Sequence, residues 1–357
     1  MKITKVSIDK FSGPVEEPFV VACGVMESND AWVVTIETDA GIKGIGSAAP
    51  WAPVTGETLE SCYEVLKLLV SQLPGMDPLD IAGIHRYMDS TIYMNGSAKC
   101  AIDTALYDIA ARNAGLPLYK FLGATQSRIM NDITISIKEP ERMAAEAEDF
   151  VKNFGFSILK VKIGLDPDHD IRALNLIREK VGPDVRIRVD ANQGFDVEGA
   201  LKILPVFEKM GIDAVEQFLP YYDVEGAAKI MAANPTKVDL MLDESIFSVH
   251  DAERAARLKA AQFFNIKLMK CGGLYYGLKI ADIAAAAGIR GMVGCMGENK
   301  ISLTAGLSLV AAKDNIVEAD CDSYMMFKGH DDGIVGGFRP EGGEIVLLDE
   351  PGLGIEL

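Results

Sequence analysis

The sequence predicts an α/β fold: a (β/α)8-type barrel with a smaller α+β domain at its N-terminus. Three observations predict it. From Asn131 onward, eight short apolar, β-branched runs alternate with amphipathic segments of helical length. Residues 1–130 lack that alternation, and the glycine-rich segment Gly336–Leu357 holds one more strand pattern, Glu344–Leu348. We therefore expect domains over 1–130, 131–330 and 331–357, the last returning to the first.

The N-terminal region is typical of a small α+β unit. Lys2–Phe11 and Ala31–Thr38 alternate polar and apolar residues as strands do, and Ile42–Ser47 is expected as the second arm of a hairpin. Helical patterns cover Glu57–Leu73, Leu79–Asp89 and Ala98–Asn113, the last with Ser97 as its N-cap and Gly115 at its end. Between the first two strands, Ser12–Asp30 is predicted as a long irregular loop, the kind that often forms a lid.

The barrel strands are predicted at eight places, and eight such units most often close into a barrel, a doubly wound sheet being the alternative. They are Ile133–Ile137, Phe156–Ile163, Val185–Val189, Ala214–Phe218, Val238–Leu242, Phe263–Met269, Gly291–Cys295 and Ile316–Ala319. The helices expected between them include Glu139–Asn153, His169–Lys180, Val197–Met210 and Leu274–Ala287. Pro205 lies inside the third of these helices and is expected to kink or split it.

Composition excludes several classes of protein. The chain of 357 residues is 49% hydrophobic and 24% charged, an ordinary globular balance. Its net charge of −17 disfavours nucleic acid and anionic membrane surfaces as partners. Six scattered cysteines without a C-x-x-C pair, and an N-terminus without the apolar core of a signal peptide, predict a cytoplasmic protein with reduced thiols.

Charged residues recur near the ends of the predicted strands. Lys160 and Lys162 share one face of their strand, because side chains alternate with a period of two. Starting from Lys162, the next charges follow at intervals of 24 to 28 residues: Asp190, Glu216, Asp243 and Lys267. Each interval is about one βα unit, so the charges are expected at a similar height around the barrel. Barrel chemistry lies at the C-terminal ends of the strands.

Three adjacent carboxylates in a buried barrel mouth repel one another unless a cation neutralises them. Oxygen ligands without His or Cys suit Mg²⁺, so Asp190, Glu216 and Asp243 are the predicted metal ligands. Taken singly, each charge has a plainer explanation as a helix cap or an edge-strand residue. Glu244 and Lys270 are assigned to that plainer class, Glu298 stays open between a supporting and a capping role, and the four histidines receive no role.

This ordered set of charges resembles the enolase superfamily and, within it, the muconate lactonizing enzyme subgroup. The resemblance covers nearly the whole chain. It implies a modified (β/α)8-type TIM barrel and an N-terminal α+β capping domain that the C-terminal segment completes. It also implies that Lys162 and Lys267 are the catalytic bases, that Lys160 assists them, and that the cofactor is Mg²⁺.

Asp320 and Asp322, two residues apart after the last barrel strand, resemble the DxD motif of dipeptide epimerases, which holds the substrate's α-ammonium group. Two carboxylates on one side of the mouth also suit a cation on elementary grounds, although an exposed acidic loop is the plainer explanation. The resemblance thus implies a small-molecule dipeptide substrate. Substrate contacts are expected from Lys160, Gly24 and Met296, with Asn192 and Glu298 in support.

One position departs from the family pattern. Members that act on Ala-Glu carry an arginine in the N-terminal lid loop, where this chain has Gly24. A glutamate side chain would lack its counter-ion, so Ala-Glu is not the expected substrate. Apolar loop residues favour an uncharged or apolar side chain instead: Val20, Cys23, Val25 and Met26.

The implied reaction is 1,1-proton transfer at the Cα of the dipeptide's C-terminal residue, through an enediolate. Inversion needs one base on each face of that carbon, so Lys162 and Lys267 are expected on opposite walls. Lys160 and the metal are expected to lower the lysine pKa values. The lid, Ser12–Asp30 with the loop Ala49–Gly56 that contains Trp51, is expected to set specificity.

Two other interpretations stay open. An o-succinylbenzoate synthase, an N-acylamino acid racemase or a muconate-type cycloisomerase would use the same metal and lysines but needs no ammonium site. The second is a non-catalytic protein that has kept the fold. The sequence leaves open which dipeptide is preferred, the stereochemical direction, the pathway and the oligomeric state, with a homo-oligomer compatible.

Overall fold

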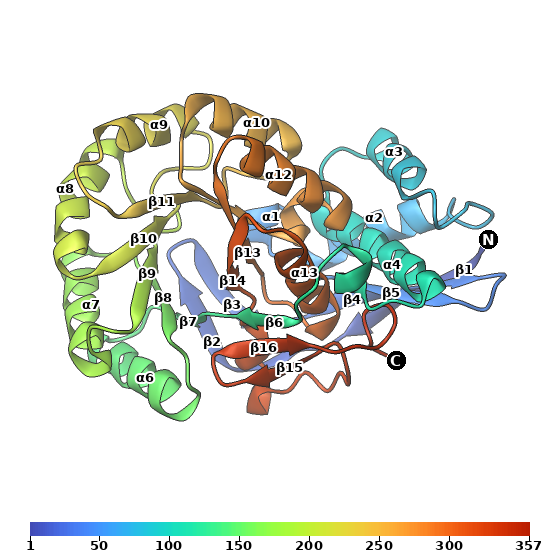
Figure 1. Ribbon diagram of the computed structural model, residues 1–357, viewed down its shortest axis with the longest axis horizontal. Coiled ribbons are helices and arrows are strands. Elements are labelled where there is room, and N and C mark those ends of the chain that lie inside the picture. The colour runs from blue at the N-terminus through green and yellow to red at the C-terminus, as the bar shows by residue number, and fades with distance from the viewer.

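The computed structural model describes all 357 residues, and its largest unit is an eight-stranded parallel sheet curled into a nearly closed barrel (Figure 1). The strands pair in chain order. They are β7 (Ile133–Ile135), β8 (Ile158–Lys162), β9 (Arg186–Asp190), β10 (Ile212–Glu216), β11 (Asp239–Leu242), β12 (Phe263–Ile266), β13 (Arg290–Gly294) and β14 (Ile316–Asp320). Each overlaps a predicted strand, and the predicted barrel is confirmed.

The barrel strands form because they are apolar runs that can be buried on both faces. Every residue of β8 is buried, including its two lysines, and only Arg186 in β9 is exposed. The first and last strands are not paired as neighbours, but the Asp132 N–H donates to the Ala319 carbonyl at 3.1 Å and the Cys321 N–H to Asn131 Oδ1 at 2.9 Å. These bonds hold the seam of the barrel together.

Helices follow the strands and form the outer ring in Figure 1. They are α6 (Pro140–Asn153), α7 (Pro167–Val181), α8 (Val197–Lys209), α9 (Val224–Ala233), α10 (Val249–Leu258), α11 (Leu268–Cys271), α12 (Leu274–Ala286) and α13 (Lys300–Ala312). The expected split of α8 at Pro205 is wrong, because one continuous helix runs through it. The strand expected over Phe263–Met269 ends earlier than predicted, at Ile266. Leu268 and Met269 belong instead to the single helical turn α11.

The N-terminal domain, beside the barrel in Figure 1, has an antiparallel sheet in the order β1–β4–β5 covered by helices. Its elements are β1 (Ile3–Phe11), β4 (Ala31–Thr38), β5 (Lys43–Ala48), α1 (Ala52–Thr55), α2 (Leu59–Val70), α3 (Ile81–Thr91), α4 (Gly96–Ala114) and α5 (Leu118–Phe121). Gly115 ends α4 as predicted, with a φ of 67°. The N-cap is Asn95 rather than Ser97, whose hydroxyl instead donates to Glu57 Oε2 at 2.7 Å.

The stretch Ser12–Asp30 is not irregular, as predicted, but holds an antiparallel hairpin of β2 (Pro14–Val21) and β3 (Gly24–Ser28) with a two-residue turn. We call this the lid hairpin. Two prolines, Pro14 and Pro18, hide the strand pattern, and both are tolerable because the hairpin has only edge strands. It lies against the first barrel strand, because the Ile137 N–H donates to the Val20 carbonyl at 3.0 Å.

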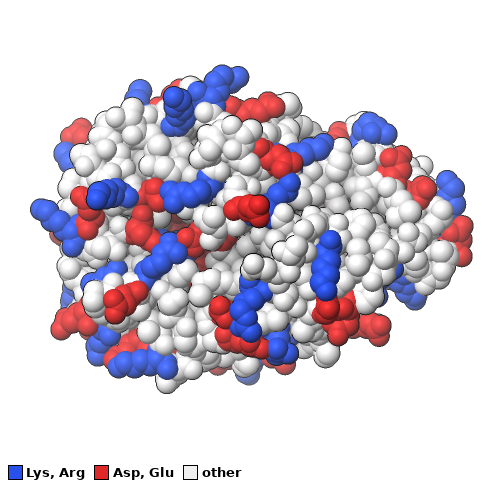
Figure 2. All heavy atoms as spheres, in the orientation of Figure 1, with Lys and Arg blue, Asp and Glu red and all other residues white.

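The C-terminal segment returns to the N-terminal domain. It forms β15 (Phe338–Glu341) and β16 (Glu344–Leu347), and β16 pairs with both β15 and β6 (Arg128–Met130). The Leu353 N–H donates to Asp108 Oδ1 of α4 at 2.7 Å. The model contains no helix with the length and hydrophobicity to cross a membrane. Acidic and basic side chains intermingle on the face in Figure 2, without a continuous basic patch.

Candidate active site

The register of the barrel places the predicted charges at one level. Lys162 pairs with Asp190 across β8 and β9, and Asp190 pairs with Glu216 across β9 and β10. Asp243 directly follows β11, and Lys267 directly follows β12. All five side chains are buried at the C-terminal end of the barrel.

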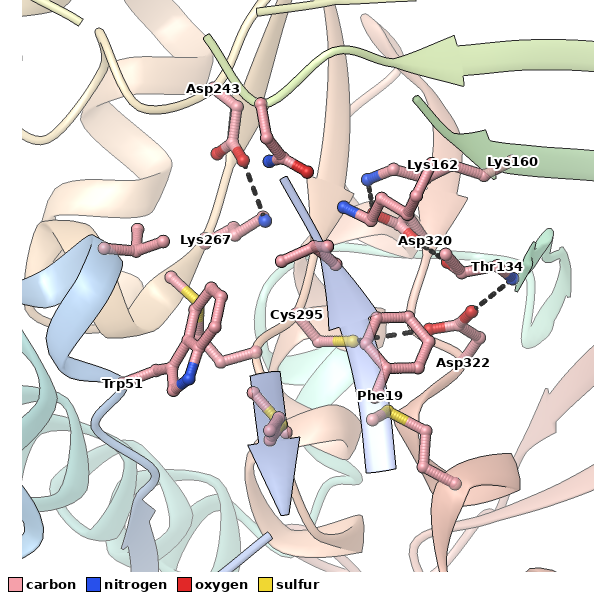
Figure 3. A pocket seen from close by; sticks show the side chains of 17 residues that line it. Phe19, Trp51, Thr134, Lys160, Lys162, Asp243, Lys267, Cys295, Asp320 and Asp322 are labelled. Carbon is pink, nitrogen blue, oxygen red and sulfur yellow. Dashed lines mark hydrogen bonds and ion pairs between the residues drawn. The ribbon is translucent and has the colours of Figure 1, made fainter. Parts of the chain in front are cut away.

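Lys162 and Lys267 face each other across a cavity. They come from β8 and from the end of β12, four strands apart in an eight-stranded barrel. Both side chains line the same cavity, and Figure 3 shows them entering it from opposite sides. A group held between them can therefore be approached from two faces.

Lys160 is the cation that joins the acidic groups. Its Nζ lies 2.8 Å from Glu216 Oε2, 3.1 Å from Asp190 Oδ2 and 2.8 Å from Asp320 Oδ2. Lys162 Nζ lies 2.5 Å from the same oxygen of Asp190. Lys160 thus connects Asp190 and Glu216, two of the predicted metal ligands, to the predicted ammonium site at Asp320, and Lys162 pairs with Asp190 alone.

Asp243 is held by two lysines, one of which the sequence interpretation missed. Lys267 Nζ lies 2.8 Å from Asp243 Oδ2, and Lys270 Nζ lies 2.5 Å from Asp243 Oδ1. Lys270 is fully buried and comes from α11, whose single turn brings it back toward β11. Lys270 therefore belongs to the candidate site and is not the helix-cap or edge-strand residue that the sequence predicts.

Three further residues support the acidic groups. Asn265 donates its amide to Glu216 Oε1 at 2.7 Å. Gln217 accepts the Asp243 N–H at 2.9 Å, and Asn192 donates to Glu244 Oε1 at 3.2 Å. Gln217 and Asn192 follow β10 and β9 with φ angles of 39° and 37°, a region that residues other than glycine rarely adopt. Such backbone conformations often occur at functional sites.

Asp320 and Asp322 lie together on the wall opposite Lys267. The Thr134 N–H donates to Asp322 Oδ2 at 2.6 Å, and Cys295 Sγ lies 3.7 Å from Asp322 Oδ1. A third buried acid, Asp132, brings an oxygen within 4.8 Å of both. Asp132 pairs with Arg188, whose Nε is 3.4 Å away. Sequence reasoning missed Asp132 because it precedes a strand rather than ending one.

The cavity between the lysines is roofed by the lid hairpin and by the loop that carries Trp51. Of the predicted residues, it is lined by Lys160, Lys162, Asn192, Asp243, Lys267, Met296, Asp320 and Asp322. Gly24 does not line it and faces Trp51 and Pro53 instead. Glu298 lies behind the lining, where it accepts the Met296 N–H at 2.9 Å.

The charges shift the pKa values of the buried groups in opposite directions. Burial, followed by the charge of Asp190, raises the pKa of Glu216 to about 7. Burial opposes ionisation of Asp190 too, but Lys162 and Lys160 outweigh it and lower its pKa to about 2. Burial disfavours the Lys267 ammonium, yet Asp243 outweighs it and raises its pKa above the usual range. Burial and Lys160 thus lower the pKa of Lys267 as expected, but the charge of Asp243, which the predicted Mg²⁺ would offset, raises it by more.

The donor set fits a hard divalent cation. Asp190, Glu216 and Asp243 offer only carboxylate oxygens, and Glu216 Oε2 is a buried oxygen whose one close partner is the Lys160 ammonium, without an aligned hydrogen bond. The site holds six buried carboxylates and four buried lysines, a formal excess of two negative charges when every group is ionised. The carboxylates are those of Asp190, Glu216, Asp243, Glu244, Asp320 and Asp322, and the lysines are Lys160, Lys162, Lys267 and Lys270.

Comparisons with known proteins agree with this geometry. Residues 3–123 match the family described as mandelate racemase / muconate lactonizing enzyme, N-terminal domain, and residues 142–357 match enolase C-terminal domain-like. The chain is 40% identical to the L-Ala-D/L-Glu epimerase of Clostridium acetobutylicum, over 100% of this chain and 99% of that one. It is 35% identical to the N-succinyl-L-Arg/Lys racemase of Bacillus cereus, over 100% and 96%.

A solved structure is also similar over its whole length. The dipeptide epimerase of Enterococcus faecalis V583, crystallised with Mg and the dipeptide L-Leu-L-Tyr, superimposes with a TM-score of 0.96 at 37% identity, and the alignment covers 100% of both chains.

Proposed function

This chain belongs to the enolase superfamily, in its mandelate racemase / muconate lactonizing enzyme group, and on that premise we propose that it is a dipeptide epimerase. The reaction is 1,1-proton transfer at the Cα of the dipeptide's C-terminal residue. One observation carries the proposal: Lys162 and Lys267 enter one cavity from opposite walls, beside the buried pair Asp320 and Asp322 (Figure 3). The similarity to epimerases in sequence and structure supports it.

The two lysines act on opposite faces of the reacting carbon. Removing the α-proton on one face and returning a proton on the other inverts the carbon, and this requires a base and an acid on opposite sides. Lys162 Nζ serves one face and Lys267 Nζ the other. Each is the base in one direction of the reaction and the acid in the reverse direction.

Asp190, Glu216 and Asp243 would hold Mg²⁺. When bound there, the ion would offset the charge of Asp243, which raises the pKa of Lys267, and would stabilise the second negative charge that develops on the substrate carboxylate. Lys160, beside these ligands, is placed to bind the same carboxylate. Lys270 and Asn265 keep Asp243 and Glu216 in position.

Asp320 and Asp322 bind the dipeptide's free α-ammonium group. Both are buried, and a buried carboxylate pair favours a cation over a neutral amide. This separates a dipeptide from an N-acylated amino acid, the substrate type in the name of the Bacillus cereus racemase.

The test is α-proton exchange in deuterated buffer with Mg²⁺ and a library of L,L- and L,D-dipeptides. We expect exchange of the C-terminal α-proton together with appearance of the other diastereomer. Absence of exchange with every dipeptide, alongside turnover of an N-succinyl amino acid, would overturn the proposal and leave the family intact.

A further inference from the structure

One face of the lid hairpin covers the cavity. Phe19 pairs with Met26, and Val21 pairs with Gly24, so these four residues lie on the same face of the hairpin. Phe19, Val21 and Met26 line the cavity. Of the lid residues expected to set specificity, Met26 thus faces the site, whereas Val20, Cys23 and Val25 are not among the lining residues.

Trp51 fills the place beside Gly24. A Cβ on Gly24 would lie 3.4 Å from Trp51 Cζ2 and 3.4 Å from Pro53 Cγ. The hairpin backbone and the indole are therefore in near contact, and a longer side chain at this position would compete with the ring for space. The missing side chain at Gly24 leaves room for the Trp51 ring. We call this ring, where it packs against Gly24, the aromatic wall.

This wall lies on one side of the cavity. In Figure 3 Trp51 lies on the Lys267 side, whereas Phe19 and Cys295 lie nearer Asp322. If the ammonium group binds at Asp322 and the reacting carbon lies between the lysines, the C-terminal side chain is the one nearer Trp51. Val54 lines the cavity as well and adds apolar surface.

A charged side chain finds no free partner on the Trp51 side of the cavity, where the carboxylate of Asp243 already pairs with Lys267 and Lys270. No arginine lines the cavity, and each lining lysine already meets a carboxylate: Lys160, Lys162 and Lys267. A carboxylate buried without a partner is costly, whereas an apolar side chain gains from burial against the indole.

We propose that this enzyme prefers dipeptides with a large apolar C-terminal side chain, and that the aromatic wall of Trp51 beside Gly24 determines this preference. The inference rests on the proposed epimerase function. It narrows that function to one substrate class and adds Trp51 as a specificity-determining residue.

The test compares initial exchange rates for L-Ala-L-Xaa dipeptides, with Leu, Phe or Tyr against Ala, Glu or Lys as the C-terminal residue. We expect kcat/KM for Leu and Phe at least about tenfold above Ala, Glu and Lys. Trp51→Ala should lower kcat/KM for L-Ala-L-Phe about tenfold more than it lowers kcat/KM for L-Ala-L-Ala.

The chain offers a matched control in its other tryptophan. Trp32 stacks on Tyr63 at 4.4 Å and donates to the Leu59 carbonyl at 2.7 Å, outside the cavity lining. Trp32→Phe should leave the order of substrates unchanged. It also makes Trp51 the only indole, so quenching or a shift of its fluorescence reports dipeptide binding without turnover.

The outcomes separate the two claims. Exchange with no dipeptide overturns the proposed function. Exchange with a preference for Glu or Lys, or an unchanged apolar preference in Trp51→Ala, overturns the specificity inference alone. The substrate series with the wild-type enzyme tests the preference for apolar C-terminal residues even where Trp51→Ala does not fold.

Discussion

At the scale of single residues, we expect Asp322 to make the enzyme prefer a dipeptide, with its free α-ammonium group, over an N-acylated amino acid. Asp322→Asn removes the charge and retains an oxygen that can accept the Thr134 N–H, now donated to Asp322 Oδ2 at 2.6 Å. We expect KM for dipeptides to rise about 10- to 100-fold, because a hydrogen bond to a charged group is worth ~1.5–3 kcal/mol. Steady-state kinetics check this, with circular dichroism confirming the fold. An unchanged KM would remove Asp322 from the ammonium site.

Cys23, in the turn of the lid hairpin, gives a prediction about pH. Burial, followed by the charge of Glu244, raises the pKa of its thiol to about 11. A raised pKa means that the unreactive thiol persists well above neutrality, so alkylation by iodoacetamide should speed up about tenfold per pH unit between pH 7 and 10. Mass spectrometry of the Cys23 peptide measures it. A rate that levels off near pH 8.5, where an ordinary cysteine titrates, would contradict this environment.

The principal charges of the site were predictable because each lies one βα unit after the last. Lys270 and Asp132 were not. Lys270 follows Lys267 by three residues, and only the turn α11 brings it back to Asp243, a placement without a period in the sequence. Asp132 precedes its strand, and only the closing of the barrel brings it beside Asp320.

At the scale of elements, the lid hairpin approaches the barrel closely at Gly297, in addition to its hydrogen bond with Ile137. A Cβ on Gly297, in the loop after β13, would lie 2.5 Å from Met26 Sδ and 2.2 Å from Asn29 Oδ1. Any side chain there must move the Met26 thioether and the Asn29 amide, which pack the lid against this loop. The contact between Gly297 of the barrel and Met26 of the lid could not be predicted from the sequence, because the two residues are far apart along the chain.

Gly297→Ala should therefore loosen the lid. We expect KM for the best dipeptide to rise about tenfold or more with a smaller change in kcat, since a displaced lid weakens binding of substrate more than it moves Lys162 or Lys267. Gly41→Ala is the control for a glycine substitution, because a Cβ there meets nothing within 4 Å, although its φ of 75° adds backbone strain. Equal effects of the two changes would mean that Gly297 does not govern docking.

At the scale of the whole molecule, α4 joins the N-terminal domain to the barrel. Asp103 of α4 accepts the Leu274 N–H at 2.5 Å at the start of α12, and His85 Nε2 lies 2.7 Å from its other oxygen. The alternation of apolar runs and helical patterns along the sequence predicted the α/β barrel and the separate N-terminal unit. It could not predict this junction, since a buried aspartate in a helix has no local signature.

The balance of charge inside the barrel predicts a global response to metal. Buried carboxylates outnumber buried lysines around Asp190, Glu216 and Asp243, so we expect Mg²⁺ to bind there, and at 100 times its Kd it should stabilise the fold by about 2.7 kcal/mol. For a chain of this length that corresponds to a rise in Tm of about 3 °C. Differential scanning calorimetry with and without EDTA measures it, and Glu216→Gln is the control that should lose the shift. An equal shift in that variant would place the ion elsewhere.

The central claim is that two lysines act on opposite faces of one carbon. Its most direct test is exchange in deuterated buffer with Lys162→Ala and Lys267→Ala, each given the L,L- and the L,D-diastereomer separately. We predict that both variants lose epimerisation by at least about 10²–10⁴-fold, and that each retains exchange with one diastereomer only, the two variants choosing opposite ones. Retention of exchange with the same diastereomer by both variants, or epimerisation by either at the wild-type rate, would contradict the account.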